Sequence, residues 1–504
     1  MNVNAAIADR RIRAALGGAI VVLVAVVVIA VASGGSSSAP PPDEAARLVP
    51  STALVYVHVS TDTGRDATRT ALKLAQRFPS FARLRNSLLR RLQDPRCGTD
   101  LRRQHGKEAA LALLNTQTGT AGSLVLVDTG KEHTGEATKG CGLVSQTYIG
   151  RFLVIGQPDS LTAARALAEA GDKNPPARSL ARNPDFEKAM AGLPADRVAD
   201  AWASADGVRR LLAPQGGVLG AADVLLDQPG LKGAGIGLVA HAKSARLVVR
   251  SELDPSIKHS QTFKPFEPTL DAQVPKGVLG YLGVSGLSTA LSRVLAAAGP
   301  QTAGLGALLR RAGRQLDQQS GGRLTGEVLA ALQGEVAVTL TPAVPAPVLT
   351  VVAHARRDTG RTLAQLETPI ARLLGKGARF QGTSVAGTPV RLLKAGPISI
   401  AYAVLGDRLV ISTATSGIAA VARGGDHVDK QDTFKTVVGD APRRVSSLLF
   451  LDFTELLRLG EQTGLGGSRA YQSVRDDLQK VRAVGAWSSG SGDESTAEIN
   501  LSIP

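Results

Sequence analysis

Two stretches of this sequence, residues 49–60 and 274–285, match each other without a gap. They read VPSTALVYVHVS and VPKGVLGYLGVS, so Val, Pro, Leu, Tyr, Val and Ser recur at the same relative positions. Each is an apolar run that starts at a proline and is rich in β-branched and aromatic residues, which predicts a strand. Because the two copies are far apart in the chain, the repeat predicts a doubled domain and not a series of short stacked units.

Later segments of the chain recur in the same order. Residues 150–166 align without a gap to residues 406–422, and Arg444-Val445 corresponds to Arg197-Val198. The predicted strands come in hairpins that are interrupted by strand–helix–strand connections. This arrangement favours antiparallel sheets that are covered by helices on one face.

The predicted fold class is therefore α+β, with an N-terminal transmembrane helix followed by two tandem duplicated halves of antiparallel sheet covered by helices. The predicted parts are a cytoplasmic N-terminus (1–14), a transmembrane helix (15–33), a Ser/Pro-rich tether (34–46), a first α+β repeat (47–262) and a second α+β repeat (271–504).

The predicted transmembrane helix indicates where in the cell the protein is located. Residues 16–32 read LGGAIVVLVAVVVIAVA, and the chain has no charge between Arg13 and Asp43. Three arginines precede the run, so the positive-inside rule places the N-terminus in the cytoplasm. The alternative is a cleavable signal peptide, since residues 30–32 form a small-x-small site, but signal cores usually span only about 7–15 residues. Both interpretations export the protein. We predict a single-pass protein of the cytoplasmic membrane with its C-terminal bulk outside.

The chain is strongly basic, with 58 Lys+Arg against 43 Asp+Glu and a net charge of +15. This excess suits anionic lipid or cell-wall polymer as a partner, although a GC-rich genome produces the same composition. Aromatic residues make up only 3% of the chain, so nucleic acid is not expected as a partner. The candidate anionic-surface contacts are arginines of one predicted helix and its continuation, and the alternative for them is a solvated helix face: Arg83, Arg85, Arg90, Arg91, Arg102 and Arg103.

Cys97 and Cys141 are the only cysteines, and in an exported protein they are candidates for a disulfide. Two alternatives stay open. The thiols are free and buried, or they bind a metal together with His105 and His133, although the spacing resembles no zinc module.

Other motifs give no catalytic residue, cofactor site or metal site. The chain has no P-loop, HExxH, GxSxG or SxxK motif. The glycines of residues 233–237 precede a predicted strand, so we interpret them as close-packing positions and not as a dinucleotide fingerprint. Glu108 and Glu335 recur in equivalent settings, as do Asp206 and Asp452, and helix capping is the expected role of each pair.

The opening VPSTALVYVHVSTD, behind an anchor and a Ser/Pro tether, resembles the bacterial domain of unknown function 3352 (DUF3352). The resemblance covers roughly residues 44–504 and implies an exported or envelope protein without supplying an activity. The predicted function is a non-catalytic binding or scaffolding module of the cell envelope. The alternatives are an envelope hydrolase with an unrecognised site and a basic adaptor for anionic lipid or wall polymer.

Overall fold

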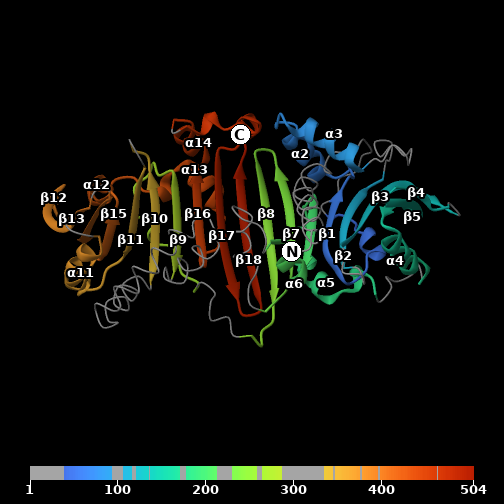
Figure 1. The fold of residues 1–504 in the computed structure, drawn as a ribbon, viewed down its shortest axis with the longest axis horizontal. Helices are drawn as coiled ribbons and strands as arrows, with labels where there is room; N and C mark the ends of the chain where they lie inside the picture. Colours follow the sequence, from blue (N-terminus) through green and yellow to red (C-terminus); the bar gives the residue numbers. More distant parts are fainter. Residues whose placement is uncertain are drawn as a thin grey trace.

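The computed structural model describes most of the chain from residue 39 onward. The described ranges are 39–92, 106–115, 121–134, 137–142, 144–170, 178–212, 230–257, 264–285, 334–343, 347–374, 377–395, 398–462 and 464–504. Within these ranges, 18 strands form one sheet, and every pairing between them is antiparallel (Figure 1). The structure therefore has an α+β fold with a large antiparallel sheet.

The first half of the sheet has the spatial order β4-β5-β3-β2-β1-β6-β7-β8. Its strands are β1 (Ala53–Ser60), β2 (Glu108–Asn115), β3 (Ala121–His133), β4 (Lys139–Cys141), β5 (Val144–Gly156), β6 (Ala199–Ser204), β7 (Leu231–His241) and β8 (Ser244–Leu253). Its helices are η2 (Ala45–Leu48), α2 (Asp66–Ala75), α3 (Phe81–Leu92), α4 (Pro158–Glu169), η4 (Leu180–Arg182), α5 (Pro184–Ala191) and α6 (Ala205–Leu212).

The second half continues the sheet in the order β18-β17-β16-β9-β10-β11-β15-β14-β13-β12. Its strands are β9 (Gly280–Ser285), β10 (Glu335–Thr341), β11 (Val348–His354), β12 (Arg379–Val385), β13 (Thr388–Ala395), β14 (Ile398–Leu405), β15 (Arg408–Ser412), β16 (Ser447–Asp452), β17 (Ala483–Ser491) and β18 (Glu494–Ser502). Its helices are α11 (Thr359–Leu374), α12 (Thr415–Arg423), η5 (Val428–Lys430), α13 (Asp432–Val438), α14 (Phe453–Gln462), η6 (Leu465–Gly467), α15 (Arg469–Gln472) and α16 (Arg475–Leu478).

The two halves join through the strands β8 and β18, which pair antiparallel at the centre of the sheet (Figure 1). Each of these strands follows a two-residue turn, and the fifth residue of β8, Val248, pairs with the fifth residue of β18, Glu498. The halves are therefore related by a pseudo-two-fold axis at this pair. Arg250 of β8 also donates to Glu494 of β18 at 2.7 Å.

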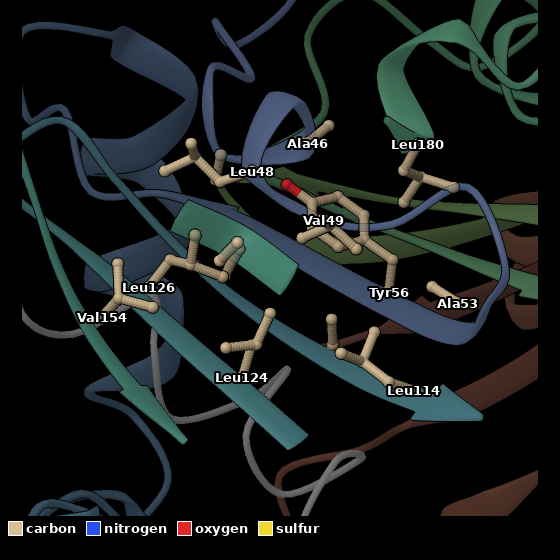
Figure 2. Close-up of a cluster of buried hydrophobic side chains, with 14 of the residues drawn as sticks. Ala46, Leu48, Val49, Ala53, Tyr56, Leu114, Leu124, Leu126, Val154 and Leu180 are labelled. Atoms are coloured by element: carbon tan, nitrogen blue, oxygen red, sulfur yellow. The ribbon is translucent and has the colours of Figure 1, made fainter. Parts of the chain in front are cut away.

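Equivalent aromatic side chains lie under both halves. Tyr56 of β1 contacts Phe186 edge-to-face at 5.9 Å between ring centroids, and Phe186 contacts Trp202 at 6.0 Å. In the second half, the same contacts join Tyr281, Phe434 and Phe450, at 5.9 Å and 5.3 Å. Figure 2 shows Tyr56 between η2 and the strands of the first half, with Leu48, Leu124 and Leu180 around it.

Helices cover both faces of the first half, whereas the sequence predicts a cover on one face. Tyr56 packs in a core with residues of η2, α4 and α5, but Val57 and Val59 pack on the other face against Ala71 and Leu74 of α2. The reason is that β1 carries large apolar side chains on both faces, and both must be kept from water.

The second half contains an additional unit. In the chain, helix α11 and strands β12, β13 and β14 come after β11 and before β15. The first half has β4 and a longer β5 at this point of the chain. The added strands extend the sheet, so β12 lies at one end of it and β4 at the other (Figure 1). The structure agrees with the alignment of residues 150–166 with residues 406–422 at its first position. Gly150 and Gly406 both adopt a positive φ, of 56° and 62°.

The predicted transmembrane helix, residues 15–33, lies outside the described residues. Among the helices that the structure describes, none combines the length and the apolar character that a membrane span requires.

Candidate functional site

Three ionisable side chains meet in the interior of the first half. His58 of β1 is directly opposite Asp200 of β6, and Glu108 begins β2 on the other side of β1. The side chains of His58, Glu108 and Asp200 point to the same face as Tyr56, because period-two alternation places Tyr56, His58 and Ser60 together. His58 is 0% exposed, and Glu108 and Asp200 are each 2% exposed.

The two imidazole nitrogens of His58 face different carboxylates. The Nδ1 atom lies 3.5 Å from Asp200 Oδ2, and the Nε2 atom lies 3.4 Å from Glu108 Oε2. Asp200 Oδ2 also accepts a hydrogen bond from Arg197 Nε at 2.8 Å. We call His58, Glu108, Asp200 and Arg197, together with Asp43, the charged cluster.

The charged cluster holds the start of the described chain, residues 39–48, which we call the docking segment. The backbone N–H groups of Glu44 and Ala45 donate to Glu108 Oε2 at 3.1 and 3.3 Å. The Tyr56 hydroxyl donates to Asp43 Oδ1, and Arg65 Nη2 donates to the Ala39 carbonyl at 2.9 Å. The last residues of the predicted tether are therefore part of the folded body.

The charges of the cluster compensate one another. Burial by itself lowers the pKa of His58, but the negative charges of Asp43 and Asp200 outweigh burial and raise this pKa well above its ordinary value. Burial favours the neutral form of Asp200, yet the positive charges of His58 and Arg197 hold its pKa below the ordinary value. Burial raises the pKa of Asp43 to about 6, although His58 opposes this shift.

The second half retains only one charged member of this arrangement. Glu335, which pairs with Ser285 as Glu108 pairs with Ser60, accepts from the N–H groups of Thr269 and Leu270 at 3.0 and 3.1 Å. Gly283 replaces the histidine, and the strand residue opposite it is Leu448 instead of an aspartate. The carboxylate that caps the entering segment is thus common to both halves, and the rest of the cluster belongs to the first half alone.

The expected helix-capping roles are confirmed for two of the four carboxylates. Glu108 accepts from the N–H groups at the start of η2, and Asp452 Oδ1 accepts from the N–H of Glu455 in α14 at 3.2 Å. Glu335 accepts from the N–H groups of an entering segment that forms a turn there and not a helix. The prediction for Asp206 is wrong, because Ser204 Oγ is the group that accepts from the N–H of Gly207. Ser204 ends β6 as Asp452 ends β16, so the sequence alignment is out of register here.

The sequence alignment is also out of register where it matches Arg444-Val445 to Arg197-Val198. Val198 donates its N–H to Leu238 and Ser446 donates its N–H to Ser488, which makes Ser446 the equivalent of Val198. Arg444-Val445 is therefore displaced by one residue from Arg197-Val198. Arg197 has no charged counterpart at the equivalent position, which Val445 occupies.

The glycines of residues 233–237 lie within β7 and do not precede a strand, and two of them, Gly233 and Gly235, are close-packing positions. A Cβ atom on Gly235 would lie 2.9 Å from the carbonyl oxygen of Ala189 in α5. Gly485 of β17 is the equivalent residue, and its Cβ would lie 2.3 Å from the carbonyl oxygen of Val437 in α13. Both helices therefore rest directly on the sheet backbone.

The basic residues that we predicted as anionic-surface contacts are only partly described. Arg83 is exposed and Arg85 is half-exposed, both on α3. Arg90 and Arg91 follow on the same helix, and Arg102 and Arg103 lie outside the described residues. Their role as anionic-surface contacts stays a prediction.

Cys141 is buried and takes part in a disulfide, and Cys97 lies outside the described residues. The pairing of the two cysteines therefore stays a prediction. His105 also lies outside the described residues, and His133 stacks on Tyr148 with 4.0 Å between ring centroids.

Asp43, His58, Asp200 and the role of Arg197 were not predicted from the sequence. The available signal was a charged residue inside an apolar strand, as in ADAWAS around Asp200 and VYVHVS around His58. A charge in such a place is rarely buried unless it is paired. Only the strand order shows that these two residues are partners.

The fold and the site together define a class of α+β proteins in which two similar halves share one antiparallel sheet. The family model for a protein of unknown function, DUF3352, matches residues 128–503, and the chain belongs to this family. The matched region begins in β3, after the repeated stretch that carries the resemblance in the sequence.

Two solved structures have a low similarity to this chain. Crystal form I of TP0453 has 11% sequence identity and a TM-score of 0.23, and the match covers 42% of this chain and 78% of that chain. Crystal form III of the same protein has 10% identity and a TM-score of 0.23, with 41% and 78% covered. No curated protein matches the chain.

Proposed function

We propose that this chain is a membrane-anchored protein of the cell envelope, with an extracytoplasmic body that is a non-catalytic binding or scaffolding module. The observation that carries the proposal is the docking segment. It follows the apolar run and the Ser/Pro-rich stretch, and it enters the body through buried polar contacts instead of hanging free.

The contacts of the docking segment support an anchoring role. They reach β1, which is hydrogen-bonded on both sides, to β2 and to β6. A segment that is held by directional hydrogen bonds to an interior strand fixes the orientation of the body relative to the membrane. A tether that only had to keep the body nearby would need none of these buried groups.

The burial of the charged cluster favours a structural role over hydrolysis. A catalytic acid or base must come within hydrogen-bond reach of a substrate. His58, Glu108 and Asp200 are all closed off from solvent beneath the docking segment and the sheet. Exposed Arg83 on α3 is compatible with the basic-adaptor alternative, which salt-sensitive binding to anionic vesicles would distinguish.

The duplicated architecture suggests how the anchor arose. We infer that the two halves descend from one ancestral domain, since they share the strand order and the aromatic contacts of Tyr56 and Tyr281. The capping glutamate is common to both halves. The additional charges at Asp43, His58 and Asp200 then specialise the half that follows the membrane segment.

Topology in cells provides the test. In bacterial spheroplasts that express the full chain, we expect the protein in the membrane fraction, and added protease should digest the body while the spheroplasts are intact. A variant that begins at residue 39 and carries a cleavable signal should be released in soluble form. A full-length chain that is protected from protease, or that is released with a new N-terminus after residue 32, would contradict the membrane anchor.

A further inference from the structure

The charged cluster has the composition of a metal site. We propose that Asp43, His58 and Glu108 bind one divalent transition-metal ion, with Zn²⁺ the best fit, and that this ion fastens the docking segment to the sheet. One potential ligand atom from each of these residues lies within 4.8 Å of the other two. The inference rests on the proposed anchoring role of the docking segment and adds the group that would hold it.

The distance between His58 and Glu108 fits two ligands of one metal ion. Zinc binds imidazole nitrogen and carboxylate oxygen at about 2.0–2.2 Å, so two ligands of a tetrahedral ion are about 3.4 Å apart. His58 Nε2 and Glu108 Oε2 are separated by 3.4 Å, which is long for a hydrogen bond between nitrogen and oxygen. The separation therefore fits two ligands of one ion, and it also fits an ion pair between a protonated His58 and Glu108.

The Nε2 atom of His58 has an ion-pair contact with Glu108 but no hydrogen bond. This side chain is 0% exposed, and its Nε2 atom makes no hydrogen bond to any group that the structure describes. Buried polar atoms nearly always have a partner, and each exception requires a reason. The Nε2 atom lies 3.4 Å from Glu108 Oε2, and a metal ion held by Asp43, His58 and Glu108 would be its partner.

A carboxylate lies at the other ring nitrogen of His58. A metal-binding histidine usually directs its second ring nitrogen to a carboxylate, which fixes the tautomer and the orientation of the ring. Asp200 occupies that position at Nδ1, and Arg197 holds Asp200 in turn. Asp200 is thus a positioning residue of the proposed site.

The second half provides an internal comparison. Its capping carboxylate Glu335 makes the same backbone contacts without a buried histidine beside it, because Gly283 stands at the position of His58. Capping the entering segment therefore needs the glutamate alone. The additional residues at 43, 58 and 200 call for a different explanation, which a shared ligand supplies.

The set of ligands determines the class of metal. One imidazole with two carboxylates suits zinc and its neighbours among the transition metals, whereas Mg²⁺ and Ca²⁺ prefer sites made only of oxygen. Since ligands must be deprotonated, binding would displace the proton of His58. The competing description is a protonated His58 that pairs with the carboxylates and needs no ion.

Metal analysis of the full-length protein tests the proposal. The protein is purified in detergent without chelator, stripped with a chelator and then titrated with Zn²⁺ or Co²⁺. We expect one tightly bound ion per chain, with visible Co²⁺ absorption, and no binding of Mg²⁺ at the same concentration. Stoichiometric binding that a His58→Gln variant retains would overturn the proposal, and so would a folded protein that takes up no Zn²⁺.

Two further variants make the assignment specific. Asp200→Asn should weaken Zn²⁺ affinity by about 10–100-fold, as is usual when the carboxylate that orients a metal-binding histidine is lost. His354→Ala is the matched control, because His354 lies beside Glu335 in the second half, at 3.7 Å, and it should leave affinity unchanged. Equal losses in both variants would contradict the site.

Amide hydrogen exchange distinguishes a failure of the metal site from a failure of the anchoring role. Slow exchange of the Glu44 and Ala45 amides in metal-free protein, together with no Zn²⁺ uptake, would overturn the metal site and leave the anchoring role intact. Rapid exchange of these amides with Zn²⁺ bound would contradict the anchoring role itself.

Discussion

Replacing Glu108 with glutamine is expected to lower the free energy of unfolding by about 3–5 kcal/mol, the usual cost of removing one partner from a buried pair. The substitution removes the negative charge that faces His58 Nε2 and weakens the cap on the docking segment. Both partners are almost fully buried, so water cannot replace the lost interaction. Denaturant unfolding of the purified protein measures the effect.

The matched control is the same substitution in the second half. Glu335→Gln weakens a cap of the same geometry, but no buried histidine lies beside it, and about 1 kcal/mol is expected. The difference between the two variants isolates the contribution of the charged cluster. Equal losses would show that Glu108 acts only as a cap.

Introducing valine at Gly485 is expected to destabilise the protein by about 3 kcal/mol, at the upper end of what overpacking costs. The new Cβ would lie 2.3 Å from the carbonyl oxygen of Val437, so α13 must move away from the sheet. The side chains of Phe434 and Val437 would then lose contact with the core around Tyr281. Thermal unfolding should show a clearly lower midpoint.

Gly490, in the same strand, provides the control. Its Cβ would meet nothing closer than 3.6 Å, and valine favours strands, so Gly490→Val should change stability little. Gly235→Val should resemble Gly485→Val, because α5 packs on Gly235 as α13 packs on Gly485. Full stability of both core variants would contradict the close packing of these helices.

Local features of the fold could be predicted from the sequence. The apolar alternation around Tyr56 and around Tyr281 identifies β1 and β9 because a strand places every second residue on one face. The recurring glutamates at 108 and 335 identify the caps. These features depend on residues that are close in the chain or that repeat at a fixed offset.

The joining of the halves could not be predicted in the same way. The pairing of β8 with β18 links residues that are about half the chain apart, and no local pattern specifies it. The one-residue slip at Arg444 has the same origin, because an Arg-Val pair in the sequence does not show which residue begins the pairing of β16 with its neighbours. The hydrogen bond of Ser446 to Ser488 fixes the register only once the hairpins are in place.

The charged cluster could not be predicted from the sequence either. His58 and Asp200 become partners because β1 and β6 are neighbours in the sheet, although they are separated by most of the first half. Asp43 looks like the end of a flexible tether, since it follows three prolines. Its contact with Tyr56 depends on the turn of η2, which the capping by Glu108 directs.

Amide hydrogen exchange in the docking segment measures whether the charged cluster holds this segment on the sheet. If the charged cluster holds this segment, the Glu44 and Ala45 amides should exchange slowly in the wild type and rapidly in Glu108→Gln. Glu335→Gln should leave them slow, because it changes only the second half. Rapid exchange of both amides in the wild-type protein would contradict the claim and leave residues 39–48 as an ordinary flexible tether.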